Sequence, residues 1–191
     1  MDSVVPNHKF AALADLQALL SHIRRAPQDH GTLHLIVRRP ETLARESVQS
    51  GALDVVQGLV GDNWSARGST KTADGTAHPD MQITLINTRL LAALTPDQGR
   101  WPLAGDQLYV DLDLSERNLP TGTRLAVGAA VLEVTPMPHN GCKKFAERFG
   151  KDAMKFAGSA AGKKLRLRGI YCKVVVSGAI AVGAAITKLA S

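Results

Sequence analysis

The spacing of apolar residues changes near residue 30. Before that point, apolar residues recur at helical spacing, namely Phe10, Leu13, Leu16, Leu20 and Ile23. This spacing predicts an amphipathic helix. Asn7 precedes it as a suitable N-cap, because its side-chain oxygen can accept from the first backbone N–H groups, and Pro27 follows it. We therefore predict a helical N-terminal extension over residues 1–30.

From His30 onward the chain contains short runs rich in β-branched residues, separated by Gly, Pro and Asn. The predicted strands are Thr32–Val37, Gln82–Ile86, Gln107–Leu112, Arg124–Val127, Val131–Thr135, Leu165–Arg168, Tyr171–Val176 and Ala179–Val182. Each run is short and bounded by turn residues, which is typical of strands. Many short strands at this spacing favour a closed or nearly closed β structure.

Two helical segments and one long loop interrupt these strands. The segment from Asn87 to Leu94 is predicted as a short helix that ends before Pro96. The segment from Cys142 to Ala157 is predicted as one helix, or as two that break at Gly150. Residues 61–80 show no apolar periodicity, and a loop of that length is usually functional or disordered. The fold class predicted for residues 31–191 is mostly β with helical insertions, a β-barrel-like domain that is α+β overall.

Composition is that of an ordinary globular protein. The chain has 191 residues, of which 45% are hydrophobic and 21% charged, enough for one domain with a sizeable core. Its two cysteines, Cys142 and Cys172, are too few for a disulfide framework. The first residues lack the features of a secretion signal, and the longest apolar stretch, 174–186, is too short to span a membrane. We expect a cytoplasmic protein with reduced thiols and no membrane contact.

Positive charge is concentrated in one part of the chain. The formal net charge is +6, and between His139 and Lys173 ten Lys or Arg residues stand against two acids, Glu147 and Asp152. Such a segment favours an anionic partner. A solvated basic face that aids solubility explains the same charge, so charge alone does not decide between the two.

The strongest chemical candidate is Cys142, in the sequence PMPHNGCKKFAERFG at residues 136–150. A turn at Asn140 and Gly141 precedes it, and a predicted helix begins at it. The helix dipole favours a thiolate there, as do the neighbouring cationic candidates His139, Lys143, Lys144 and Arg148. A thiolate can attack sulfur, hold a persulfide or bind a soft metal. The alternative is a small buried apolar residue, the usual role of a free cysteine.

Other candidate sites have simpler explanations. Cys172 lies in a predicted strand and is interpreted as a core residue, although with His139 and Cys142 it could complete a zinc site. The acidic residues Asp111 and Asp113 alternate with apolar ones, as on a strand with one wet face. The chain has no G-x-G-x-x-G opening a βα unit, no P-loop, no G-x-S-x-G and no H-E-x-x-H. Classical nucleotide-binding folds, serine hydrolases and zincins are therefore excluded.

The order of several short motifs resembles the MOSC family, named after the C-terminal domain of molybdenum cofactor sulfurases. The matching elements are Gly58–Asp62 (GLVGD), Asp111–Leu119 (DLDLSERNL), Gly122–Thr135, Cys142 as the family's single cysteine, and Gly169–Gly183. The resemblance covers roughly residues 31–186. Two departures stand out: the family often has R-x-P-C, where this chain has His139-Asn140-Gly141-Cys142, and the last element ends without the usual acid.

The resemblance implies a β-barrel decorated with helices and a role in handling the molybdenum cofactor. By this resemblance, Cys142 carries sulfur as a persulfide or ligates the molybdenum of the pterin cofactor, molybdopterin. Lys143, Lys144 and Arg148 would then contact the anionic cofactor's phosphate, with His139 beside them. Arg67, in the long loop, would act as a lid residue, and Asn118 would bind the pterin edge. No pyridoxal phosphate is expected in this chain.

Three functions remain open at this point. The first is a cofactor or sulfur carrier without turnover of its own, with a cysteine desulfurase or a molybdoenzyme acceptor as partner. The second is a molybdoenzyme component that reduces N-hydroxylated compounds, as relatives in this family do, with electrons from a separate donor protein. The third is a basic anion- or nucleic-acid-binding module, against which the 4% aromatic content counts. Whether the protein is an enzyme stays open.

Overall fold

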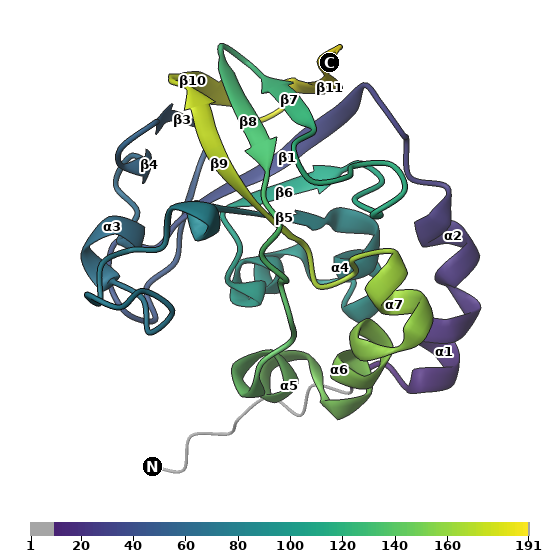
Figure 1. Cartoon of the computed structure of the whole chain (residues 1–191). Helices are drawn as coiled ribbons and strands as arrows, with labels where there is room; N and C mark the ends of the chain where they lie inside the picture. Colours follow the sequence, from purple (N-terminus) through teal and green to yellow (C-terminus); the bar gives the residue numbers. More distant parts are fainter. Residues whose placement is uncertain (1–9, 191) are drawn as a thin grey trace.

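The computed structural model describes residues 10–190, in which seven strands form a closed ring in the order β11-β7-β8-β9-β5-β6-β1, with β11 pairing back to β1 (Figure 1). The ring consists of β1 (Gly31–Arg38), β5 (Ile83–Asn87), β6 (Leu108–Asp111), β7 (Arg124–Val127), β8 (Ala130–Val134), β9 (Ile170–Val176) and β11 (Ala185–Lys188). All its neighbours are antiparallel except β5 and β6, which are parallel. The ring confirms the predicted mostly β, barrel-like fold.

Four further strands extend this barrel. The short strand β2 (Glu46–Val48) continues the sheet beside β1, and a separate three-stranded sheet has the order β10-β3-β4. Its members are β3 (Ser50–Asp54), β4 (Gly58–Leu59) and β10 (Gly178–Ala181). In Figure 1 this small sheet lies at the upper left, beside the end of β9.

Helices cover one side of the barrel. They are α1 (Leu13–Ala18), α2 (Leu20–Arg24), α4 (Thr88–Leu94), the 3-10 helix η2 (Gln98–Ala104), α5 (Lys143–Phe149), α6 (Lys151–Gly158) and α7 (Ala160–Lys164). Figure 1 shows α1, α2 and α5–α7 gathered below and to the right of the strands. None of the helices within residues 10–190 has the length and apolar character that crossing a membrane requires.

Two apolar clusters hold these layers together. The interior of the barrel is filled from the strands, for example by Leu33, Leu85 and Leu132, each fully buried. A second cluster lies between the outer barrel surface and the helices, where Tyr109 meets the α5 residues Phe145 and Phe149. Burying each such side chain stabilises the fold by about 1.5–3 kcal/mol. The helices, α5 included, are thereby fixed against the barrel.

Most predicted strands agree with the observed ones to within a residue, but the strand predicted over Leu165–Arg168 is wrong. These residues form a turn after α7. The Leu167 N–H donates to the Gly162 carbonyl (2.9 Å), and Arg166 has a φ of +48°. A positive φ is incompatible with a strand, so the alternation of Leu and Arg here does not reflect two sheet faces.

The predicted N-terminal helix is divided in two. Leu19, 40% exposed, separates α1 from α2, and its N–H is shared between the carbonyls of Asp15 and Leu16 at 3.2 Å each. Leu16 and Ile23 are buried in the cluster beneath the helices. The predicted cap, Asn7, lies outside the described residues. The division of the chain into residues 1–30 and 31–191 stays a prediction.

Of the two alternatives for residues 142–157, one helix or two, the structure has two, because α5 and α6 are separate helices that meet at Gly150. Gly150 has a φ of +95°, and a Cβ there would lie 2.9 Å from the side chain of Phe10. Only glycine tolerates both conditions easily. The long loop over 61–80 contains a single turn of helix, α3 (Trp64–Arg67), and a short 3-10 helix, η1 (Pro79–Met81), with irregular backbone between them.

Candidate functional site

The segment that joins β8 to α5 carries the candidate cysteine. It is anchored at its start by Thr135, whose hydroxyl donates to the Asp80 carbonyl (2.6 Å) and to the Tyr171 carbonyl (3.2 Å). At its end, Cys142 has extended backbone and caps α5, with its carbonyl accepting from the N–H of Phe145 (3.0 Å). The Cys142 side chain itself is exposed.

Helix α5 is a fixed support for this thiol. Phe145 and Phe149 point into the core one turn apart, with their ring centroids 5.2 Å from each other. The Arg168 guanidinium lies 5.0 Å from the centroid of the Phe145 ring, a cation–π contact that ties α5 to the start of β9. Cys142 is therefore an exposed thiol on a well-anchored helix end.

The three cations predicted beside Cys142 are placed differently from one another. The Lys143 side chain is 92% exposed and lies 3.9 Å from the Glu147 carboxylate, and Lys144 is also exposed. Arg148 is half-buried and donates to the carbonyl of Leu103 in η2 (2.8 Å). The two lysines thus face solvent, whereas Arg148 already has a partner within the protein.

A cavity of about 300 Å³ lies beside this segment. Its walls come from residues 135–141, which lead to Cys142, and from the end of α6 through α7 to the start of β9. The charged residues in its walls are Lys163, Arg166, Arg168 and Glu116. Cationic groups therefore outnumber acidic ones, as suits an anionic ligand. The volume is at the lower end of the range for small-molecule sites.

His139 forms part of the cavity wall and is nearly buried, at 9% exposure. Its ring stacks on Tyr171 with centroids 4.5 Å apart, and its Nδ1 lies 3.6 Å from Oδ1 of the buried Asp106. Burial, together with the nearby charges of Arg168 and Arg39, lowers the pKa of His139 well below its usual value. The imidazole is therefore neutral at pH 7 and adds no positive charge beside Cys142.

Two buried arginines, Arg39 and Arg168, and the half-buried Arg148 surround the end of η2. Arg148 donates to the Leu103 carbonyl, Arg168 to the Ala104 carbonyl (3.0 Å) and Arg39 to the Gly105 carbonyl (3.1 Å). Three consecutive backbone oxygens thus accept from three guanidiniums. The turn that carries Asp106 is thereby fixed by the residue that follows β1, by α5 and by the segment that precedes β9.

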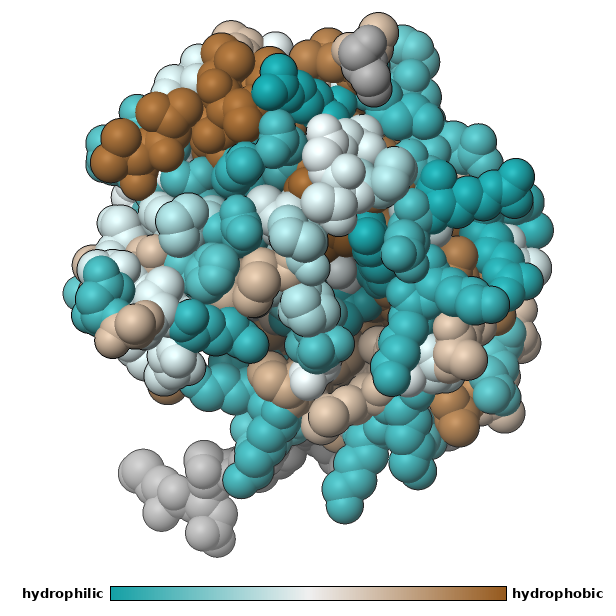
Figure 2. Space-filling view, in the orientation of Figure 1, coloured by the Kyte–Doolittle hydropathy of each residue, from teal (hydrophilic) through white to brown (hydrophobic). Residues whose placement is uncertain are grey.

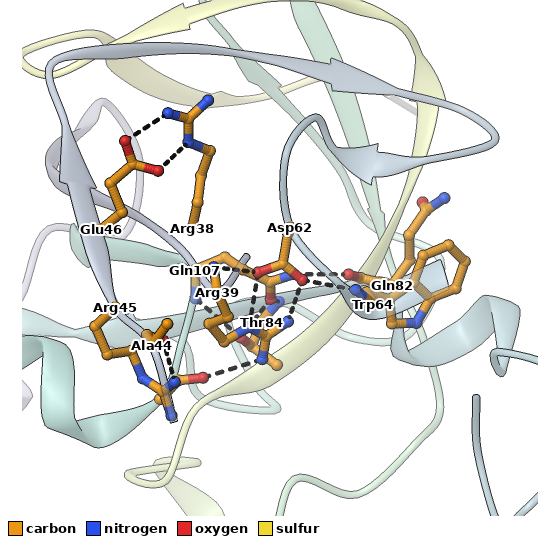
Figure 3. A network of polar contacts seen from close by, with 11 residues as sticks. Arg38, Arg39, Ala44, Arg45, Glu46, Asp62, Trp64, Gln82, Thr84 and Gln107 are labelled. Atoms are coloured by element: carbon orange, nitrogen blue, oxygen red, sulfur yellow. Dashed lines mark hydrogen bonds and ion pairs between the residues drawn. The ribbon is translucent and has the colours of Figure 1, made fainter. Parts of the chain in front are cut away.

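The carboxylate of Asp62 holds Arg39 in this arrangement (Figure 3). Its two oxygens accept from the Arg39 guanidinium at 2.8 Å each, and Oδ2 also accepts from the Arg39 backbone N–H (2.9 Å). The N–H of Trp64 (3.0 Å) donates to Oδ1 as well, which fixes the start of α3. The Gly-Asp element read from the sequence is therefore the anchor of the long loop.

Arg67, the predicted lid residue, ends α3 and stays exposed on one side. Partial burial lowers the pKa of its guanidinium, and the neighbouring charge of Arg39 acts in the same direction. The same two causes, with Arg148 added, lower the pKa of Arg45. These positive groups lie close enough to repel each other, a condition that bound anions relieve.

The Asn118 side chain is hydrogen-bonded to other residues of the protein. Its side-chain amide donates to the carbonyls of Gln28 (2.9 Å) and Asp113 (2.7 Å), and its oxygen accepts from the Lys188 ammonium (3.0 Å). These bonds join the 113–119 turn to the segment before β1 and to β11. A contact between Asn118 and a pterin stays a prediction.

Cys172 lies in the barrel interior. Its side chain is fully buried in β9, and burial raises the pKa of its thiol. Within residues 10–190 no group of three or more His, Cys, Asp or Glu side chains is close enough to hold a metal ion. Asp111, from the acidic run, instead pairs with Arg89 at 2.6 Å.

The apolar surface lies elsewhere on the molecule. Figure 2 shows it as a brown area at the upper left, over the small sheet of β3, β4 and β10. The exposed valines there are Val55, Val56, Val60 and Val176. The cavity beside Cys142 is lined by residues of other segments, four of them charged, so the two surfaces are distinct.

Several residues of the site were not singled out by sequence reasoning. Lys163, Arg166 and Arg168 belong to the basic segment, but their chemistry was assigned only to the segment as a whole. Asp106 and Tyr171 carry no motif, and nothing in their sequence neighbourhood indicates that they meet His139. For Lys163, Arg166 and Arg168, the signal in the sequence was the concentration of positive charge between residues 139 and 173.

Comparisons with known proteins agree with this architecture. The family model described as MOSC domain matches residues 72–187, more than half of the chain. No curated protein sequence matches. Among solved structures, the YUAD protein from Bacillus subtilis is similar with a TM-score of 0.62 at 16% identity, covering 82% of this chain and 93% of that one. YiiM from Geobacillus stearothermophilus has a TM-score of 0.57 at 18% identity, covering 84% and 75%. YiiM from Escherichia coli has a TM-score of 0.55 at 19% identity, covering 84% and 70%.

Proposed function

The chain belongs to the MOSC domain family, and from this membership we propose that it handles the molybdenum cofactor through Cys142, by ligating the metal or by carrying sulfur. The family is associated with that cofactor. The observation that supports the proposal is the exposed Cys142 thiol, which directly follows the residues that line a cationic cavity. An anionic ligand in that cavity lies next to a soft, nucleophilic group.

The residues present fit a pterin with a phosphate and a metal–sulfur centre. Lys163 and Arg168 supply charge for the phosphate, and the Nε atom of Arg168 is buried without a hydrogen-bond partner among the described residues. A buried N–H group without a partner costs free energy, and a ligand atom that accepts a hydrogen bond from it removes that cost. When bound, the cofactor supplies a metal that changes oxidation state, and a thiolate is a ligand that such soft centres accept.

The residues in and around the cavity would have different roles, depending on where they lie. Cys142 would hold the metal or the sulfur, and Arg168 and Lys163 would orient the anionic end of the ligand. Lys143 and Lys144, both exposed, would attract the ligand at longer range. Arg148 acts indirectly in this scheme, because its bond to the Leu103 carbonyl fixes α5 and hence the thiol.

Sulfur carriage at the same residue needs no added oxidant. The Cys142 thiolate attacks the outer sulfur of a donor persulfide, such as that of a cysteine desulfurase. A new S–S bond forms on Cys142 while the donor's S–S bond breaks, and the donor cysteine leaves as a thiolate. Exposure of Cys142 makes this attack sterically feasible, whereas Cys172 is enclosed in the barrel.

Metal and pterin analysis tests the proposal. The wild-type chain and the Cys142→Ser variant are purified from a host that makes the cofactor. Molybdenum is then measured by mass spectrometry and pterin by fluorescence after oxidation. We expect both in the wild type, with the molybdenum lost in Cys142→Ser. A persulfide on Cys142, detected by alkylation and mass spectrometry after incubation with a cysteine desulfurase, is the result expected of the sulfur carrier.

Cys172→Ala is the matched control, because it removes the other thiol from a position without access to solvent. Per amount of folded protein, Cys172→Ala should contain as much molybdenum, pterin and persulfide as the wild type. A wild type that holds neither molybdenum dependent on Cys142 nor a persulfide on Cys142 would contradict the proposal.

The remaining functional alternatives stay predictions with their own measurements. Reduction of N-hydroxylated compounds requires bound cofactor and a separate electron donor, so turnover with an added reductant tests it. Binding to nucleic acid through the basic segment would show an affinity that falls steeply with salt. The cytoplasmic location expected from the sequence is tested by cell fractionation.

A further inference from the structure

A histidine and a carboxylate face each other at the wall of the cavity beside Cys142. Nδ1 of His139 lies 3.6 Å from Oδ1 of Asp106, and neither atom has a hydrogen-bond partner among residues 10–190. The Asp106 side chain is fully buried. Two unpartnered polar atoms at this depth are costly unless one donates to the other. A shift of a few tenths of an ångström brings them into hydrogen-bonding range.

Burial raises the pKa of Asp106, but the contact with the Arg168 guanidinium acts against that rise, and we infer that the carboxylate is the acceptor of that hydrogen bond. Its other oxygen, Oδ2, accepts from the Arg168 guanidinium at 2.8 Å. Arginine is always protonated and can only donate. Because Arg168 is itself buried, its charge needs a counter-ion, and Asp106 is the carboxylate that contacts it. Oδ1 is then the oxygen left for His139, whose Nδ1 lies 3.6 Å away.

The imidazole has a single proton to donate. The carboxylate of Asp106 lies near it, the charges of Arg168 and Arg39 act on it, and Tyr171 lies against its ring. The two arginines and the burial of the ring all oppose a second proton. The one proton therefore belongs on Nδ1, toward Asp106. Since Nδ1 is the enclosed nitrogen, Nε2 is the nitrogen left for the cavity that His139 lines.

We propose that Asp106 is a positioning residue that holds His139 in the Nδ1–H tautomer, so that Nε2 presents a lone pair to the cavity. The ligand class that fits is one with an N–H or O–H group opposite His139, in addition to the anionic group that the arginines bind. A pterin ring carries such N–H groups, and this part of the inference rests on the proposed function. The tautomer itself is a property of the protein alone.

Nuclear magnetic resonance of the ¹⁵N-labelled protein tests the tautomer directly. Two-bond correlations distinguish a protonated from an unprotonated ring nitrogen, and the His139→Gln variant assigns the signals. At pH 7 we expect a protonated Nδ1 and an unprotonated Nε2 in His139. Free neutral histidine prefers the opposite tautomer, so this result is not the default. A protonated Nε2 in the wild type, in either the neutral or the charged ring, would overturn the proposal.

The Asp106→Asn variant should reverse the tautomer. Arg168 requires an acceptor, so it keeps the amide oxygen and turns the amide N–H₂ toward His139. Nδ1 must then accept, and the proton moves to Nε2. Asp62→Asn is the matched control, because Asp62 is also fully buried and bound to an arginine, Arg39. An unchanged His139 tautomer in Asp106→Asn would show that Asp106 does not position the ring.

A chemical probe tests whether Nε2 faces the cavity. Diethyl pyrocarbonate acylates unprotonated, accessible imidazole nitrogens, and mass spectrometry locates the adducts. We expect an adduct on His139 in the wild type, with the exposed His34 as internal standard. The His139 adduct should be lost in Asp106→Asn relative to that of His34. No adduct on wild-type His139 would overturn the orientation, even if Asp106→Asn does not fold.

These outcomes are separate from those of the proposed function. The tautomer and the adduct are measured on protein without added cofactor. A chain that retains no molybdenum but has the Nδ1–H tautomer contradicts only the proposed function. A chain that binds the cofactor but has the Nε2–H tautomer contradicts only this inference.

Discussion

Removing the Asp62 carboxylate should destabilise the fold far more than removing an exposed carboxylate with a similar partner. Asp62 is fully buried, and it accepts from the Arg39 guanidinium, the Arg39 backbone and the Trp64 backbone (Figure 3). The Asp62→Ala substitution leaves the Arg39 charge, 8% exposed, without a counter-ion. Breaking a buried pair in this way costs about 3–5 kcal/mol.

The expected loss is measurable by two methods. For a chain of this length, each kcal/mol lowers the melting temperature by about 2–4 °C, so Asp62→Ala should melt roughly 6–20 °C below the wild type. Urea unfolding at 25 °C, followed by circular dichroism, gives the free energy of unfolding directly. A total stability of about 5–15 kcal/mol is typical of such proteins, so the variant should still fold in dilute buffer.

The exposed pair of Arg38 and Glu46 provides a matched control. Arg38 also makes two hydrogen bonds to one carboxylate, that of Glu46, at 3.1 and 2.8 Å, but these side chains are 30% and 50% exposed. Exposed pairs of this kind contribute about 0.2–1 kcal/mol. Equal losses for Asp62→Ala and Glu46→Ala would refute the argument from burial. The double variant Arg39→Met with Asp62→Leu should recover part of the loss, because it leaves no unpaired buried charge at this position.

Three further predictions concern the cysteines, the buried histidine and one glycine. In the folded protein, iodoacetamide should label the exposed Cys142 but reach Cys172 only after unfolding, as mass spectrometry can show; equal labelling would contradict the structure. Wild-type stability should fall as the pH drops below about 6.5. His139 becomes protonated there in the unfolded chain, whereas its lowered pKa keeps it neutral in the folded protein. His139→Gln should lessen that pH dependence, measured by urea unfolding, and an identical dependence would argue against a neutral buried ring. Gly169→Ala should cost at least about 1–3 kcal/mol, because φ is +105° and the new Cβ would overlap the Leu85 carbonyl oxygen; Gly122→Ala, at +88° in open space, should cost less.

The strands that were predicted correctly are those whose sequence pattern matches a local burial pattern. Arg124–Val127 and Val131–Thr135 alternate between inner and outer faces, and they pair with each other across a short turn. Strand β11 was missed, and so were β2, β3 and β4. Each of these has five residues or fewer, as β7 and β8 do, but none has their regular alternation of buried and less buried residues. Their pairing partners, not their own sequences, make them strands.

The site was predictable only where it is local in sequence. Cys142 and the helix that follows it could be placed because a turn, a thiol and two phenylalanines lie within one short segment. His139 was expected to be a cation, since no sequence feature indicates that Asp106 and Arg168 enclose it. Contacts between residues so distant in sequence are set by the closure of the barrel, which the order of short motifs indicates but does not specify.

That closure also constrains when the protein can fold. The ring is completed where Gly31 and Thr32 of β1 pair with Ile186 and Ala185 of β11. The two partners are separated by most of the chain, and contacts of such high sequence separation form slowly. During synthesis, β1 leaves the ribosome long before β11, so the edge of β1 that pairs with β11 stays unpaired until β11 is made. Removing β11 should therefore leave an open barrel with an aggregation-prone edge, rather than a slightly smaller version of the native fold.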